Sequence, residues 1–167
     1  MKIVIADAGP LIALSRIDQL QLLQQLFQEV VITEIIRDEV LINEHCLGKE
    51  ALEKAINAQW INVKKVNLKT WQPLNPGVDA GERSAIFLAT QAPKSTLLIM
   101  DDQVGRAEAR YQKLAVIGTA AVIGMAKEQE LIDSAKTVLH ELRDAGYYIG
   151  DAIIQTVLKD IGEHIGR

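Results

Sequence analysis

Cysteine and histidine are scarce in this chain of 167 residues. Its single cysteine, Cys46, excludes an internal disulfide bond and a zinc site built from several thiolates. The three histidines, His45, His140 and His164, are far apart and show none of the spacings that are typical of metal-binding motifs. A soft metal site of the zinc-finger kind is therefore excluded.

Long hydrophobic runs are also absent. No stretch approaches the roughly 18 uncharged apolar residues that a membrane-spanning helix requires, and the apolar run at residues 3–6 is too short for a signal peptide. We therefore expect a soluble, cytoplasmic protein with no membrane segment. Aromatic residues make up 4% of the chain, so aliphatic side chains must fill its core.

An excess of positive charge is missing too, because the net charge is −4. Simple nucleic-acid-binding proteins are usually basic. The composition is only a weak argument against nucleic acid, however, since clustered acids lower the net charge while the cations they bind restore positive charge locally.

Short aliphatic segments alternate with segments of helical periodicity. The expected strands are residues 3–6, 30–32, 60–66, 96–100 and 115–117; the expected helices begin near residues 10, 20, 33, 49, 79, 103, 119, 134 and 150. Such alternation is typical of a parallel sheet covered on both faces. We predict a three-layer α/β/α fold with a central, mainly parallel sheet of four or five strands. It forms a single domain over residues 1–167, with residues 131–167 as a C-terminal helical extension.

Acidic residues directly follow two of the expected strands. Asp7 follows residues 3–6, and Asp101 and Asp102 follow residues 96–100. Ligands of open α/β sheets bind outside the carboxyl ends of the strands, so these acids are expected at one edge. The alternative is that Asp7 and Asp102 only cap the helices that follow them.

Two glutamates lie on the apolar faces of expected helices. Glu39 follows Ile36 by three residues, and Glu82 precedes Ile86 by four. Burial of a carboxylate is costly unless it is paired or binds a metal. The alternatives are that Glu39 borders the apolar stripe and reaches water, and that Glu82 forms a capping box with Asp79.

The candidate ligands of a metal ion in one shared hole are Asp7, Glu39, Glu82 and Asp102, with Asp101. Clustered carboxylates repel one another unless a cation compensates, and oxygen ligands suit Mg²⁺ or Mn²⁺. Two such ions ~4 Å apart can activate a water for phosphodiester cleavage. No Ser-His-Asp or Cys-His nucleophile system is apparent, and no glycine-rich phosphate loop indicates a bound nucleotide cofactor.

A basic stripe is expected beside this hole. Arg106, Arg110 and Lys113 are spaced at i, i+4 and i+7, which places them on one helix face suited to RNA phosphates. The alternative is an ordinary solvated face with Glu108 nearby.

These motifs, in this order, resemble those of PIN-domain proteins, and more narrowly a PIN-like branch of uncharacterised prokaryotic proteins grouped with the VapC-type toxins. The resemblance is carried by residues 5–14, 32–40, 81–86, 98–106 and 116–119, and it runs from about Met1 to Glu130. It implies a PIN fold, metal-dependent endoribonuclease activity and the role of toxin in a type II toxin–antitoxin pair. It also implies a homodimer and a small antitoxin protein that blocks the site.

By this resemblance, Asp7 matches the first family acid, Glu39 the second, and Glu82 the acid at a helix start. The acid after the later strand matches Asp102 or Asp101, and Asp102 fits the family spacing better. The resemblance thus assigns catalysis to the first three acids together with Asp102, and it adds Asp101 as a further metal ligand.

The chain departs from the family pattern at two positions. Many PIN nucleases carry a small polar residue where Gly9 stands, and Thr or Ser where Met100 stands. Both departures leave the number of metal ions and the strength of catalysis open. The alternatives to a ribonuclease are a catalytically degenerate PIN-like module that binds nucleic acid or a protein partner, and a metal-dependent phosphatase.

Overall fold

The computed structural model describes residues 2–42 and 48–162. His45, Cys46 and His164 lie outside these residues, as do the expected helix ends at residues 43 and 164. Within the described part of the chain, no helix is both long enough and apolar enough to cross a membrane.

A five-stranded sheet with all neighbouring strands parallel forms the centre of the molecule, which confirms the predicted α/β class and sheet. The strands, in the order β3-β2-β1-β4-β5, are β1 (Ile3–Ala6), β2 (Val30–Thr33), β3 (Ile61–Lys64), β4 (Thr96–Ile99) and β5 (Ala115–Ile117). The strand order reverses at β1, since β2 and β3 extend to one side and β4 and β5 to the other. In open α/β sheets a ligand crevice forms outside the carboxyl ends of the strands at such a reversal.

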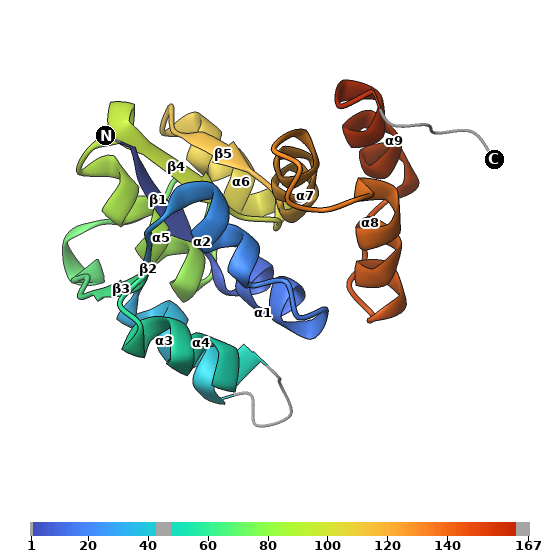
Figure 1. Ribbon diagram of the computed structural model, residues 1–167. Helices are drawn as coiled ribbons and strands as arrows, with labels where there is room; N and C mark the ends of the chain where they lie inside the picture. The colour runs from blue at the N-terminus through green and yellow to red at the C-terminus, as the bar shows by residue number, and fades with distance from the viewer. Residues whose placement is uncertain (1, 43–47, 163–167) are drawn as a thin grey trace.

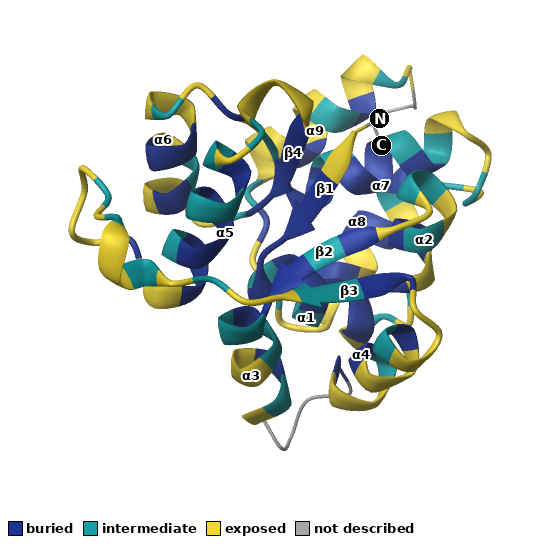
Figure 2. Cartoon of the chain, turned by 90° about the vertical axis from the view of Figure 1, so that its left-hand side faces the viewer, coloured by how far each residue is buried: buried dark blue, intermediate teal, exposed yellow. Residues whose placement is uncertain are grey.

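Helices cover both faces of the sheet. On one side lie α1 (Ala8–Arg16), α2 (Gln21–Phe27), α4 (Gly48–Asn57) and α7 (Thr119–Glu128); on the other lie α5 (Ala80–Thr90) and α6 (Gln103–Tyr111) (Figure 2). The helix α3 (Glu34–Ile42) packs against both α1 and α5, and thus connects the two layers. Short 3₁₀ turns, η1 (Leu68–Thr70) and η2 (Pro93–Ser95), flank α5.

Two further helices follow the sheet. The helices α8 (Ala135–Asp144) and α9 (Asp151–Asp160) pack on α7 and lie at one end of the molecule (Figure 1). Gly146 lies between them with a φ of 92°, a left-handed conformation that glycine adopts without steric cost. The segment between Gly146 and α9 runs back toward the carboxyl end of the sheet, because Tyr147 there contacts Asp101.

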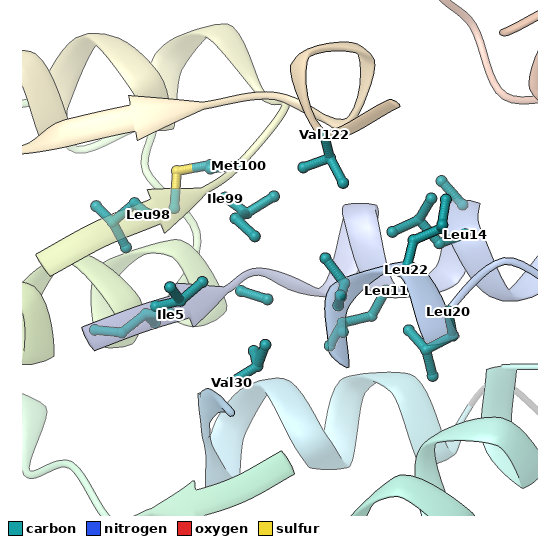
Figure 3. Close-up of a cluster of buried hydrophobic side chains, with 14 of the residues drawn as sticks. Ile5, Leu11, Leu14, Leu20, Leu22, Val30, Leu98, Ile99, Met100 and Val122 are labelled. Carbon is teal, nitrogen blue, oxygen red and sulfur yellow. The ribbon is translucent and has the colours of Figure 1, made fainter. Parts of the chain in front are cut away.

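Aliphatic side chains fill the interior, as the low aromatic content predicts. Ile5 of β1 and Leu98 of β4 lie opposite each other in the parallel ladder and are fully buried. Leu11 and Leu14 of α1 and Val122 of α7 pack in the same cluster (Figure 3). Because this packing fixes α1 and α7 against the sheet, it also fixes the residues at the strand ends.

Candidate active site at the carboxyl edge of the sheet

Asp7 is the acid at the end of the central strand. Its backbone N–H donates to Ile99 O at 2.9 Å, which extends the pairing of β1 with β4 by one residue. The residue is 7% exposed, and its side chain makes no capping hydrogen bond to α1. Asp7 therefore occupies the N-cap position of α1, as the cap alternative expected, but its carboxylate does not make the capping bond.

Burial gives Asp7 an unusual acidity. Desolvation raises its pKa from the usual 3.8 to about 8, the Ala8 N–H opposes this rise, and the charges of Glu82, Asp79 and Glu39 add to it. Two other segments of the chain, the start of α5 and the helix α3, thus bring acids close enough to raise the pKa of Asp7.

Glu82 is both a member of the capping box and a buried acid, so both predictions for it are correct. Asp79 Oδ1 accepts from Glu82 N at 2.8 Å, and Glu82 Oε2 accepts from Asp79 N at 3.1 Å. Glu82 is nevertheless only 5% exposed. Desolvation raises its pKa to about 7; a hydrogen bond from the Asp79 backbone opposes the rise, and the charges of Asp79 and Asp102 add to it.

Asp79 also belongs to the acid cluster, although the sequence predicted it only as the capping partner of Glu82. Its charge raises the pKa of Asp7, Glu39 and Glu82. The capping-box motif could have indicated this role of Asp79, because the motif holds two carboxylates together at the start of α5.

Glu39 approaches the cluster from the solvent side. The residue is exposed, whereas Ile36 and Val40 form the buried face of α3, so the predicted burial of Glu39 is wrong and the border position is correct. Its Oε2 still lies 3.1 Å from the point that a Cβ on Gly81 would occupy. Partial desolvation, followed by the charge of Asp79, raises its pKa. Glu39 therefore closes the outer side of the cluster.

The two adjacent aspartates after β4 have different partners. Asp102 is exposed and caps α6, with Oδ2 accepting from Gly105 N at 3.0 Å, as the cap alternative predicted. Asp101 accepts from Thr119 N at 2.8 Å, from Thr119 Oγ1 at 2.5 Å and from the Tyr147 hydroxyl. Asp101 thus ties β4 to the start of α7 and to the C-terminal segment, while Asp102 stays on the side of Glu82.

Tyr147 is a site residue that sequence reasoning missed. Its hydroxyl donates to Asp101 and lies 3.6 Å from the point that a Cβ on Gly9 would occupy. Burial and the charge of Asp101 raise the pKa of this hydroxyl, so it stays protonated. No local pattern signals this, because 46 residues separate Tyr147 from Asp101 along the chain.

Met100 packs beneath the cluster. It is fully buried, and its sulfur lies 2.6 Å from the point that a Cβ on Gly105 would occupy; the Glu82 carboxyl carbon lies 3.2 Å from the same point. Gly105 therefore permits α6 to approach Glu82 closely, and Met100 supplies an apolar floor.

Comparisons with known proteins agree with this geometry. The model of a family described as DUF3368, a PIN domain, matches residues 3–163. The chain belongs to this PIN-domain family. A PilT N-terminus domain protein of the hyperthermophilic archaeon Sulfolobus solfataricus P2 has a similar solved structure, with a TM-score of 0.54 at 15% identity over 72% of this chain and 89% of that one. None of the curated proteins compared with the chain matches it.

PIN domains are generally nucleases that use divalent metal ions and bind RNA. In this PIN domain the donors fit such an ion by type, since Asp7, Glu39, Glu82 and Asp102 offer only carboxylate oxygens. The charges of neighbouring acids add to the raised pKa values of Asp7 and Glu82, as a cluster suited to a cation would show. Within residues 2–42 and 48–162, however, no three acidic, histidine or cysteine side chains are already close enough to enclose an ion.

The basic residues of the PIN domain only partly match their prediction. Arg106 and Arg110 line a cavity beside Asp101. The helix α6 ends at Tyr111, so Lys113 lies beyond it with a φ of 62° and does not extend this face as predicted. Glu108 is buried and accepts from Asn75 N at 2.9 Å, which anchors the loop at residues 67–78 instead of neutralising the arginines.

Proposed function

We propose that this PIN domain is a Mg²⁺- or Mn²⁺-dependent endoribonuclease. The observation that carries the proposal is the convergence of acids from separate elements, which are partly withdrawn from water and feel the charge of neighbouring acids. Asp7 of the β1 end, Glu39 of α3 and Glu82 of α5 all have raised pKa values, and Asp102 contributes to that of Glu82. The ion pairs Arg37–Asp38 and Arg143–Asp151 involve none of these acids.

In the proposed reaction Asp7, Glu39, Glu82 and Asp102 hold the metal. A bound divalent cation lowers the pKa of water and stabilises charge on the phosphate. Glu82, held by the capping box at the start of α5, would keep one carboxylate oriented toward that cation. The water would lose a proton to solvent as its oxygen bonds to phosphorus, the bond to the leaving oxygen would break, and that oxygen would take up a proton from solvent.

Residues around the acids orient the substrate in this proposal. Arg106 and Arg110 would bind phosphate oxygens of the RNA backbone, and Lys113 would add a weaker contact beyond α6. Asp101 was proposed from the sequence as a further ligand. Its three hydrogen-bond donors favour a positioning role instead, because its oxygens are already engaged.

The biological setting remains part of the proposal. On the resemblance to VapC-type toxins, the domain would act in the cytoplasm as a homodimeric toxin that a small antitoxin protein blocks.

A second candidate is a degenerate PIN-like module that binds nucleic acid or a protein without cutting. The exposed position of Glu39 and the apolar Met100 favour this candidate. Calorimetric titration with Mn²⁺ separates the two, because only the nuclease requires binding that both Glu39→Ala and Asp102→Ala weaken.

The direct test is the Asp7→Asn variant. The amide keeps the shape of the carboxylate and removes its charge, so we expect the fold to be intact and cleavage of RNA to fall by at least about 100-fold, in line with the typical loss on removing an essential acid–base or electrostatic group. Cleavage is measured on metal-stripped protein refilled with Mn²⁺, with circular dichroism as the check on folding. Undiminished cutting by the folded variant would refute the assignment.

A further inference from the structure

A cavity of about 770 Å³ lies beside the acid cluster. It is formed by α6, the end of β5, the start of α7, and the segment from Tyr147 through α9. Its charged lining residues are Asp101, Arg106, Arg110 and Asp160, with Tyr147 and Tyr148 as the aromatic ones. The C-terminal segment thus lines one side of the cavity, and α6 with the end of β5 lines the other.

The α6 wall of this cavity carries two arginines. Arg106 and Arg110 are separated by one helical turn, and within the described residues neither forms an ion pair with an acid. Glu108 between them points inward to Asn75 and does not compete. Arginine guanidinium groups at this spacing suit the successive anionic phosphates of a nucleic-acid backbone.

The opposite wall presents an aromatic ring. Tyr148 is 89% exposed, and its hydroxyl lies 3.9 Å from the point that a Cβ on Gly150 would occupy, so its side chain extends over the start of α9. Arg143 fixes this segment, because it donates to Ile149 O at 2.9 Å and to Asp151 Oδ1 at 2.7 Å. An exposed tyrosine on a fixed segment is suited to stack with an unpaired base.

The cavity connects with the acid cluster at Asp101. The point that a Cβ on Gly118 would occupy is 2.7 Å from both Arg106 Nη1 and Asp101 Oδ1, so the guanidinium lies next to the aspartate. Tyr147 lines the cavity and also approaches Gly9, the residue two places after Asp7. A polymer that leaves the cavity at this end therefore reaches the acids directly.

We propose that this cavity binds a single-stranded segment of the RNA substrate next to the bond that is cut, with Arg106 and Arg110 on its phosphates and one base stacked on Tyr148. The inference rests on the proposed ribonuclease function and deepens it, since it assigns substrate binding to the C-terminal helical extension. Single-stranded RNA fits because its bases are free to stack, whereas those of a duplex are enclosed.

The test uses the full chain with Asp7→Asn, which prevents cleavage, and a mixed-sequence RNA decamer that carries 2-aminopurine. We expect the fluorescence of the base to be quenched on binding. Adding Tyr148→Leu should abolish the quenching and weaken Kd about tenfold, the usual loss for one stacked base, and Tyr148→Phe should preserve both. In the cleaving chain, Tyr148→Leu should raise KM about tenfold and change kcat less than twofold.

Two matched controls, Tyr111→Leu and Lys113→Gln, change residues that do not line the cavity. Tyr111→Leu removes another exposed tyrosine from α6 and should leave binding unchanged. Arg110→Gln should weaken binding and reduce its salt dependence, whereas Lys113→Gln, with the same change of charge, should have a smaller effect.

The outcomes separate this inference from the proposed function. If cleavage depends on Asp7 but Tyr148→Leu leaves Kd, KM and the quenching unchanged, the cavity inference is wrong and the nuclease stands. If the wild-type chain cuts no RNA but Tyr148-dependent quenching persists, the cavity binds RNA and the nuclease proposal fails. A dimer in sedimentation that Ile153→Asp dissociates, with RNA affinity unchanged, would make the cavity an interface between copies and overturn the inference.

Discussion

The buried carboxylate of Asp7 lowers the stability of the fold and places an acid in the candidate site. Its carboxylate is buried at the end of β1, makes no capping bond, has a backbone hydrogen bond at Ala8 but no basic partner, and faces the charges of other acids. A buried carboxylate without a positively charged partner disfavours the folded state, and it takes up a proton unless a cation compensates. Such a position is a strong sign of a functional site, because an aliphatic residue there would pack at lower cost.

This burial predicts how the metal-free protein responds to pH. The pKa of Asp7 rises from 3.8 to about 8 on folding, and that of Glu82 rises from 4.5 to about 7. Their contribution to stability is therefore fully present at pH values below about 4 and is lost as pH rises through about 7 to 8, since only the unfolded chain ionises freely. We expect the free energy of unfolding in chelator to fall between pH 5 and pH 8.5.

Asp7→Asn should remove most of this fall and stabilise the metal-free protein at pH 8.5 by roughly 2–4 kcal/mol, because each unit of pKa difference corresponds to about 1.4 kcal/mol. Urea denaturation at the two pH values measures it. The matched control is Asp144→Asn, an exposed acid of α8. A wild-type stability that does not change over this range would show that Asp7 is not buried as a free acid.

At the scale of elements, the starts of α5 and α6 position two acids of the candidate site. The capping box of α5 orients Glu82, and the cap of α6 orients Asp102, so the hydrogen bonds that begin these helices also fix the carboxylates. Close packing of the two helices brings the acids together, because Gly105 removes the side chain that would separate α6 from Glu82.

Gly105→Ala tests this close approach. A Cβ would lie 2.6 Å from Met100 Sδ, so α6 must shift or Met100 must repack. We expect a loss of about 1–2 kcal/mol of stability, in which overpacking outweighs the better helix propensity of alanine, together with weaker Mn²⁺ binding as Glu82 moves.

The control is Gly9→Ala in α1, where the added Cβ would make an ordinary 3.6 Å contact with Tyr147 Oη. Thermal denaturation and Mn²⁺ titration of both variants provide the comparison. Equal stability and equal Mn²⁺ affinity in the two variants would contradict a tight α5–α6 contact at Gly105.

At the scale of the molecule, the sheet and its C-terminal helices act as one scaffold for the site. Acids come from the ends of β1 and β4 and from α3 and α5, while Tyr147 returns from the segment before α9. A ligand that binds this assembled site and not the unfolded chain must stabilise the whole fold by mass action.

We therefore expect Mn²⁺ to raise the melting temperature at pH 8. At a concentration of 100 times Kd the stabilisation is about 2.7 kcal/mol, which corresponds to roughly 5–10 °C for a chain of this size. The rise should disappear in Asp7→Asn and persist in Asp144→Asn. A rise of equal size in all three proteins would place the ion elsewhere.

The agreement between sequence and structure is greatest where patterns are local. The helix α3 begins where it was expected, with Thr33 Oγ1 accepting from Ile36 N at 3.1 Å as its cap, and the short apolar runs form the expected strands. The prediction for Glu39 is less accurate, because helical periodicity does not fix how deeply the border of a helix is covered. Lys113 was misplaced since helix ends depend on tertiary contacts as much as on propensity.

The sequence alone determined the alternation of strands and helices, the acids at two strand ends and the capping box, because each depends on residues that are neighbours in the chain. Only the tertiary structure decided that Asp101 is tied to Thr119 and Tyr147, that Asp102 stays beside Glu82, and that the C-terminal segment walls a cavity with Arg106. The physical reason is that these contacts join residues far apart in the sequence, and packing of the sheet and its helices sets their distances, which no local period encodes.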